Sequence, residues 1–154
     1  MKGFTILELV ISIAIIAIIS VAISTNLISF QRVASLDAAA KDIVSQLRSV
    51  QNKALSGEDG NSDGTGDSWG VRFSNSTYDT YAEFYGASFN SANVTGTTTL
   101  SSSVIFINPA SSATKDIVFT KITGTTSPST IIIQTQDGSQ TKTINVATST
   151  INFY

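Results

Sequence analysis

The chain has 154 residues and contains neither cysteine nor histidine. Without cysteine it can form no disulfide and has no thiolate nucleophile, and without histidine it has no Ser–His–Asp triad. Most zinc sites use one or both of these residue types, so they are excluded as well. Catalysis would have to rest on carboxylates, Lys, Tyr or Ser alone, and the sequence therefore predicts a protein that is not an enzyme.

Charge is also sparse, because only 13% of the residues are Asp, Glu, Lys or Arg, while 42% are hydrophobic. The nine Lys and Arg residues are scattered singly, as Lys115, Lys121 and Lys142 illustrate. Binding of nucleic acid needs clustered cations, so we expect no nucleic-acid partner. The length leaves room for one domain with an appended element.

Proline and glycine are missing from the whole stretch between Phe4 and Ser56. Its first part is apolar as far as Ile28 and carries no charge between Leu9 and Ile23. At ~1.5 Å per residue, a helix of this length can cross the ~30 Å hydrocarbon core of a membrane. A secretory signal peptide would have a longer basic region and a small-residue cleavage site after the apolar run. We therefore predict a hydrophobic transmembrane helix over residues 4–29.

The helix is predicted to continue over residues 30–56 as an amphipathic segment. Apolar or small residues recur there at intervals of three and four, which places them on one helical face: Val33, Leu36, Ala40, Ile43, Leu47, Val50 and Ala54. Gly57 is a natural C-terminal stop. The two segments together predict one continuous helix of about fifty residues, roughly 75–80 Å long.

Residues 57–154 change to short β-rich runs separated by polar turns. Strands are predicted at Trp69–Phe73, Tyr81–Tyr85, Val104–Ile107, Ile117–Thr120, Ile131–Thr135, Thr141–Val146 and Thr150–Phe153. The polar segment Gly86–Ser103 is predicted to be an exposed loop, and Asp137-Gly138 indicates a two-residue hairpin turn. The predicted fold is α+β: a long N-terminal helix packed against an antiparallel β-sheet globular domain, with Val33, Leu36, Ile43, Leu47 and Val50 buried between them.

One acid, Glu8, interrupts the apolar N-terminus, and it follows Lys2, Gly3 and Phe4 at a fixed spacing. This Lys-Gly-Phe-Thr-x-x-Glu pattern before a long apolar helix resembles the processing site of type IV pilins and pseudopilins. The resemblance implies that a prepilin peptidase removes residues 1–3, cutting between Gly3 and Phe4, and methylates the new amino terminus of Phe4.

The resemblance also implies a role for Glu8, which would pair with the Phe4 amine of a neighbouring subunit. A carboxylate at membrane depth is costly unless it is paired, so such residues usually mark function. The pairing would neutralise two buried charges and fix the axial register of the subunits. The chain departs from many bacterial pilins in one respect: Ala17 and Thr25 stand where those pilins have a helix-breaking Gly and Pro.

The remainder, including Trp69-Gly70-Val71-Arg72-Phe73, is similar to the H-type minor pseudopilins of type II secretion and to related minor pilins. The resemblance implies a structural subunit of a type IV pilus or secretion pseudopilus, held in the cell membrane and then in a periplasmic or extracellular filament. Its partners would be other subunits, the prepilin peptidase and the inner-membrane assembly platform. An unprocessed, membrane-anchored binding module or adhesin is the alternative.

An acidic, glycine-rich segment follows the predicted helix. Oxygen-bearing side chains alternate around Gly64 as in a calcium loop: Asp59, Asn61, Asp63, Thr65 and Asp67. The position where such a loop has a bidentate Glu is occupied by Gly70. No cofactor is required by this pattern, and a structural Ca²⁺ that orders the segment is one interpretation. The other is a solvated turn rich in Asp and Gly.

Overall fold

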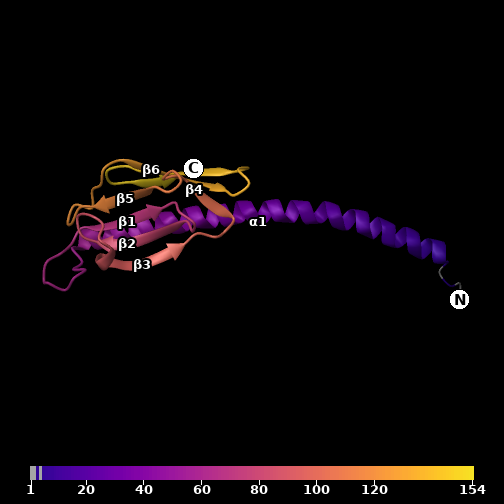
Figure 1. The fold of residues 1–154 in the computed structure, drawn as a ribbon, viewed down its shortest axis with the longest axis horizontal. Helices are drawn as coiled ribbons and strands as arrows, with labels where there is room; N and C mark the ends of the chain where they lie inside the picture. The colour runs from indigo at the N-terminus through magenta and orange to yellow at the C-terminus, as the bar shows by residue number, and fades with distance from the viewer. Residues whose placement is uncertain (1–2, 4) are drawn as a thin grey trace.

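The structure is a computed structural model that describes Gly3 and residues 5–154, and for residues 21–26 only the backbone. The described residues form one long helix, α1 (Ile6–Ser56), followed by a β-rich domain (Figure 1). Its strands are β1 (Trp69–Ser74), β2 (Thr80–Tyr85), β3 (Val94–Thr99), β4 (Val104–Asn108), β5 (Thr114–Phe119), β6 (Ser129–Thr135), β7 (Thr141–Val146) and β8 (Ile151–Phe153), with a short 3-10 turn at Ser91–Asn93. The predicted α+β fold is confirmed.

Helix α1 has 51 residues and is closed at both ends by local hydrogen bonds. Thr5 is the N-cap, and its side chain accepts from the backbone N–H of Glu8. Gly57 ends the helix in the left-handed conformation at φ 66° and donates its N–H to the carbonyl of Ala54. A residue without a Cβ adopts that conformation at no steric cost, so the predicted stop at Gly57 is confirmed.

The strands form two antiparallel sheets, a division that the strand pattern alone did not specify. Sheet A has the order β3-β2-β1-β5 and sheet B the order β4-β6-β7-β8. Both sheets lie over the C-terminal part of α1, while its N-terminal part extends away from them (Figure 1). We call residues 6–34 the stalk and residues 35–154 the head.

The core of the head forms where α1 meets both sheets. Six of the seven residues on the predicted helical face are at most 1% exposed: Leu36, Ala40, Ile43, Leu47, Val50 and Ala54. The prediction for Val33 is wrong, because that side chain lies just before the head and is 44% exposed. Facing the helix are buried side chains of both sheets, among them Phe73, Phe119 and Ile133. Burying each Leu, Ile or Phe side chain stabilises the fold by about 1.5–3 kcal/mol.

All seven predicted strands are present, and an eighth, β3, lies inside the segment predicted to be a loop. That part of the prediction is wrong. Residues 94–99 read Val-Thr-Gly-Thr-Thr-Thr, and all but Val94 are exposed, so the strand has no buried face to produce an alternating pattern. Its conformation comes from pairing with the edge of β2, a tertiary contact that lies outside the local sequence.

The hairpin between β6 and β7 is confirmed at Asp137-Gly138, but the predicted two-residue turn is wrong. Thr135 donates its N–H to the carbonyl of Gln140, so the turn contains residues 136–139. Gly138 takes a positive φ of 74° within it. The side chain of Asp137 bonds Ser139, which favours the longer turn.

Among the described residues, no helix meets both the length and the hydropathy that a membrane span requires. The predicted span, residues 4–29, includes Phe4 and the side chains of residues 21–26, which lie outside the described part of the chain.

Candidate functional site

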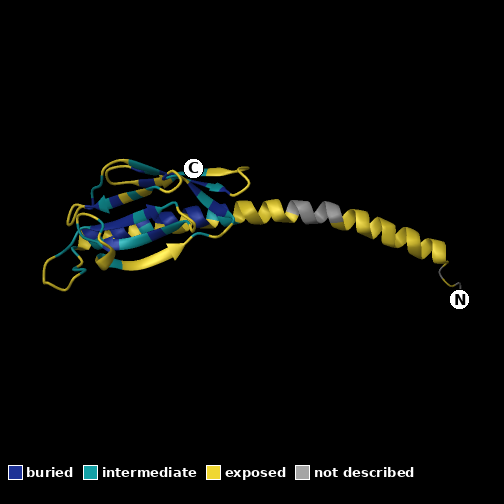
Figure 2. Cartoon of the chain, in the orientation of Figure 1, coloured by how far each residue is buried: buried dark blue, intermediate teal, exposed yellow. Residues whose placement is uncertain are grey.

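The described side chains of the stalk are exposed along its whole length (Figure 2). Every large apolar side chain from Ile6 to Ile19 is more than half exposed, with the highest values at Ile6 (86%) and Ile18 (72%). Ser12 and Ser20 donate their hydroxyls to carbonyls of the preceding turn, as expected for serines in an apolar helix. Contiguous apolar surface of this extent marks a region that another apolar phase or partner covers.

Glu8 lies in the first turn of α1, where the helix dipole favours a negative charge. It is exposed, and none of the six ion pairs between described residues includes it. Gly3 is exposed too, and a Cβ built on it would meet nothing within 4 Å. Phe4 lies outside the described residues.

The acidic segment is organised by the carboxylate of Asp59. One of its oxygens accepts the backbone N–H groups of Asn61, Ser62 and Asp63, and the other accepts that of Gly64 at 2.6 Å. A single side chain therefore takes up four loop amides that would otherwise need water.

The other predicted ligands also use their oxygens inside the loop. Asp63 accepts the N–H and the hydroxyl of Thr65, and these bonds, with one from Asn61, lower the pKa of its carboxyl. Asp67 accepts the N–H of Gly60 at 3.0 Å. Within the part of the chain that the structure describes, no three acidic side chains gather into a possible cation site. The calcium site at Asp59, Asn61, Asp63, Thr65 and Asp67 stays a prediction.

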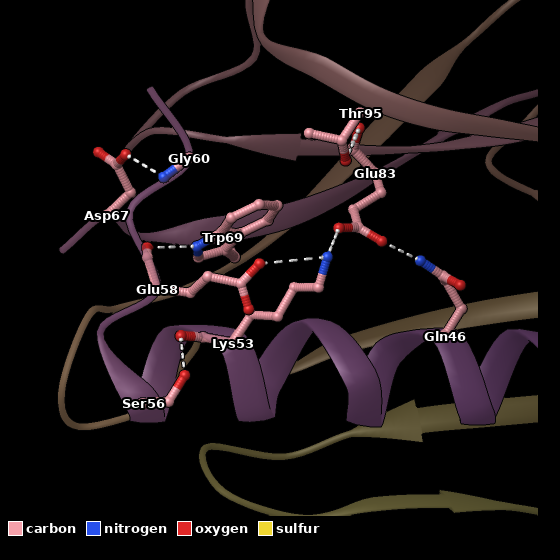
Figure 3. A network of polar contacts seen from close by, with 9 residues as sticks. All are labelled: Gln46, Lys53, Ser56, Glu58, Gly60, Asp67, Trp69, Glu83 and Thr95. Carbon is pink, nitrogen blue, oxygen red and sulfur yellow. Dashed lines mark hydrogen bonds and ion pairs between the residues drawn. The ribbon is translucent and has the colours of Figure 1, made fainter. Parts of the chain in front are cut away.

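A polar network joins the helix to sheet A beneath β2 (Figure 3). The Glu83 side chain is only 11% exposed, and its Oε1 lies 2.7 Å from the Nζ of Lys53. Gln46 donates to the other carboxylate oxygen. The ammonium of Lys53 also lies 4.5 Å from the ring centre of Trp69 and 3.7 Å from Glu58. Two helical side chains thus satisfy the one carboxylate that β2 directs inward.

Electrostatics hold this network in its charged form. Burial alone would lower the pKa of Lys53, but its contacts with Glu83 and then Glu58 outweigh that effect and raise it. The indole N–H of Trp69 donates to the carbonyl of Glu58 at 2.9 Å, which ties the start of the acidic segment to the same network. Removing one partner would leave a buried charge uncompensated, so the network fixes the head on the helix.

This network was not predicted from the sequence, although β2 carries a signal for it. Tyr81, Glu83 and Tyr85 alternate along the strand, so they share one face. Because Tyr81 is buried, Glu83 also had to face the core and required a cation. The choice of Lys53 depends on how α1 lies beneath the strand, which the sequence does not state.

Two comparisons identify the stalk and the fold. Residues 1–24 match the family described as the prokaryotic N-terminal methylation motif. The chain resembles the solved minor pseudopilin EpsH from the Type 2 Secretion System of Vibrio cholerae, with a TM-score of 0.53 and 15% identity over 78% of this chain and 96% of that one. The N-terminal residues therefore carry the methylation motif, and the chain has the fold of a minor pseudopilin. At this identity the EpsH likeness shows the fold alone, and no curated protein sequence matches the chain.

The match to the methylation motif confirms the N-terminal resemblance on which the processing predictions depend. Gly3, Phe4 and Glu8 all fall inside the matched residues. Processing at Gly3, methylation of Phe4 and pairing through Glu8 remain predictions, since a sequence match does not test what each residue does.

Proposed function

We propose that this protein is a structural subunit, a minor pseudopilin or pilin, that assembles through its stalk into a type II secretion pseudopilus or a type IV pilus. The observation that carries the proposal is the uninterrupted helix of 51 residues, whose N-terminal part extends beyond the head with apolar side chains on every side. A helix that is apolar all round is stable only where lipid or other helices surround it.

In the proposed pathway the stalk is first held in the cell membrane with the head outside. A prepilin peptidase then cuts after Gly3, which leaves a new amine on Phe4. When the subunit moves from the membrane into a filament, the stalks of other subunits replace lipid around its own stalk. The inner-membrane assembly platform is the partner for this step. No catalytic group in the head is needed, because the chain acts by packing and display.

Glu8 gives the assembly its register in this proposal. Its carboxylate is the single acid of the stalk, and the structure leaves it without an ion pair among the described residues. In a filament, the Phe4 amine of the next subunit would be its partner. An ion pair in an apolar surrounding contributes little net stability, but losing one member is costly, so it selects the single register in which both charges are matched.

The test is incorporation of a Glu8→Val variant into the native filament, measured beside its amount in the membrane fraction. Membrane insertion should persist, since a charge is removed from an apolar helix. Incorporation should fall about tenfold or more, because an unmatched buried charge costs several kcal/mol. Asp42→Val, which removes an exposed acid of α1 within the head, is the matched control and should assemble normally. Parental incorporation of Glu8→Val would contradict the register role.

A further inference from the structure

Phe84 of β2 is buried on the side of sheet A that faces away from α1. Side chains alternate along a strand, so Tyr81 and Glu83 point toward the helix while Phe84 points the other way. Its partner on β1 is Gly70, where a Cβ would lie 2.6 Å from the Cζ of Phe84. Glycine within a strand often marks such a close approach. Phe84 is 0% exposed and lies apart from the described core residues between α1 and the sheets, so a segment on the outer face must cover it.

The cover is the segment that joins β2 to β3, residues 86–93, which we call the strap. The ring of Phe89 in the strap lies edge-on to the ring of Phe84, with 5.3 Å between the ring centres. The guanidinium carbon of Arg72 lies 3.6 Å from the centre of the Phe89 ring. Arg72 is held in turn by Asp116 of β5, whose two carboxylate oxygens accept from its Nε and Nη2 at 2.6 Å each. Phe89 therefore contacts side chains of both β1 and β2.

Hydrogen bonds fix the two ends of the strap. Gly86 takes a positive φ of 110° and donates its N–H at 2.7 Å to the carbonyl of the residue that precedes β1. At the other end, the side chain of Asn93 donates to the last carbonyl of β2 at 3.2 Å. Residues 87–88 and 90–92 are exposed, so Phe89 is the side chain that holds the middle of the strap on the sheet. A segment with so few buried contacts can open without unfolding of the whole head.

We propose that the strap is a lid that opens and closes independently of the rest of the head, with Phe89 as its latch. In the closed state the latch covers Phe84 and stacks on Arg72. Opening moves the ring of Phe89 into water and uncovers the apolar surface that Phe84 and Gly70 form on the outer face of sheet A. The strands of sheet A stay paired, because their register does not involve residues 86–93. The lid is a property of the head and does not depend on assembly through the stalk.

Hydrogen exchange of individual backbone amides in the full chain, kept in detergent, tests the lid. Three amides report on the strap because each donates a hydrogen bond: Gly86, Ala92 and Asn93. In the parent these amides should exchange at least about tenfold faster than the paired amides of β6. Low concentrations of denaturant should not change their rates, because local opening exposes little new surface.

Three variants examine the latch. Phe89→Ala should speed exchange of the strap amides by about tenfold or more, since the contacts with Phe84 and Arg72 are lost. Exchange in β6 and β7 should stay at the parental rate. Arg72→Gln, which removes the stacked guanidinium but keeps both aromatic rings, should give a severalfold increase at the same amides. Ser88→Ala is the matched control: this side chain is exposed in the strap, so no rate should change.

Several results would overturn the proposal. If the strap amides of the parent exchanged only as fast as those of β6, the strap would open only when the head unfolds. If Phe89→Ala failed to fold, or accelerated exchange equally throughout the head, Phe89 would be part of the global fold and not a latch. Unchanged strap rates in both Phe89→Ala and Arg72→Gln, or an equal acceleration by Ser88→Ala, would also contradict the role of Phe89.

Discussion

The two parts of α1 have the same secondary structure and opposite surroundings. In the stalk, the large apolar side chains from Ile6 to Ile19 are all more than half exposed, while in the head Leu36, Ile43 and Leu47 are at most 1% exposed. This difference in exposure follows from how the apolar residues are arranged around the helix and not from how many there are. An apolar stripe can be covered by one partner, here the two sheets, whereas a surface that is apolar all round needs neighbours on every side. The head therefore completes its own core, whereas the apolar surface of the stalk stays exposed, as the proposed assembly requires.

Truncating a side chain on the buried apolar face of α1 should have the largest effect on the stability of the head. Leu47→Ala should lower the free energy of unfolding of the head by about 2–5 kcal/mol, because it leaves a cavity between the helix and both sheets. Ile13→Ala in the stalk is the matched control and should change it by less than about 0.5 kcal/mol. Denaturant unfolding of the full chain in detergent, followed by Trp69 fluorescence, measures both. Equal losses in the two variants would remove the distinction between stalk and head.

The second effect concerns the network that fixes the head on the helix. Lys53→Met should destabilise the head by about 1–3 kcal/mol, because Glu83 would remain buried without its cation. Adding Glu83→Gln should recover part of that loss, since no buried charge is left. Lys41→Met is the control: this lysine is 64% exposed and pairs with Asp37 on the surface, so a change of at most about 0.5 kcal/mol is expected. A double variant that is less stable than Lys53→Met would contradict this explanation.

At the junction of stalk and head, a smaller effect should depend on pH. Arg32 of the stalk lies 2.6 Å from Asp137 in the turn between β6 and β7. Hydrogen bonds from Thr135 and Ser139, with a contribution from Arg32, lower the pKa of Asp137. The stability from a carboxyl with a lowered folded pKa is present above its unfolded value of about 3.9 and is lost as the pH falls below it.

Asp137→Asn should therefore melt at a lower temperature than the parent at pH 7. The difference between the two melting temperatures should become smaller at about pH 2–3. Thermal unfolding at both pH values measures this change. Hydrogen bonds from the turn are the main cause of the lowered pKa of Asp137. Most of the difference in melting temperature that Asp137→Asn causes at pH 7 should therefore remain when both proteins also carry Arg32→Gln. If the difference in melting temperature were the same at both pH values, Asp137 would act through packing alone.

The acidic segment should give the smallest effect. If it binds calcium, the lack of a bidentate Glu suggests an affinity near ~10⁻⁴–10⁻³ M, so millimolar calcium should raise the melting temperature slightly. A chelator should reverse the rise, and Asp63→Ala should abolish it. If millimolar calcium did not change the melting temperature of the parent, the calcium site would be contradicted. The segment would then be a solvated turn organised by Asp59.

Local rules predicted most of the fold. Spacings of three and four identified the buried stripe, and Gly57 marked the end of α1 because no other residue type adopts its conformation so easily. Val33 continues the stripe but is exposed, because periodicity does not show where the sheets end. Strand β3 was missed since an exposed edge strand lacks the alternation that a buried face produces.

The candidate sites also differ in how far the local sequence predicts them. The stalk motif was predictable, because Gly3, Phe4 and Glu8 are close together in the sequence and their spacing is itself the signal. The Lys53–Glu83 pair, in contrast, joins residues 30 positions apart. The alternation along β2 shows that Glu83 faces the core, but which cation meets it depends on tertiary structure.

The most direct test of the account is the intact mass of the protein isolated from its native host. The account predicts a mature chain that begins at Phe4, with one methyl group added at its amino terminus. That result would supply the amine that Glu8 requires in a filament. A chain that retains Met1–Gly3 would contradict the account and would favour an unprocessed, membrane-anchored binding module.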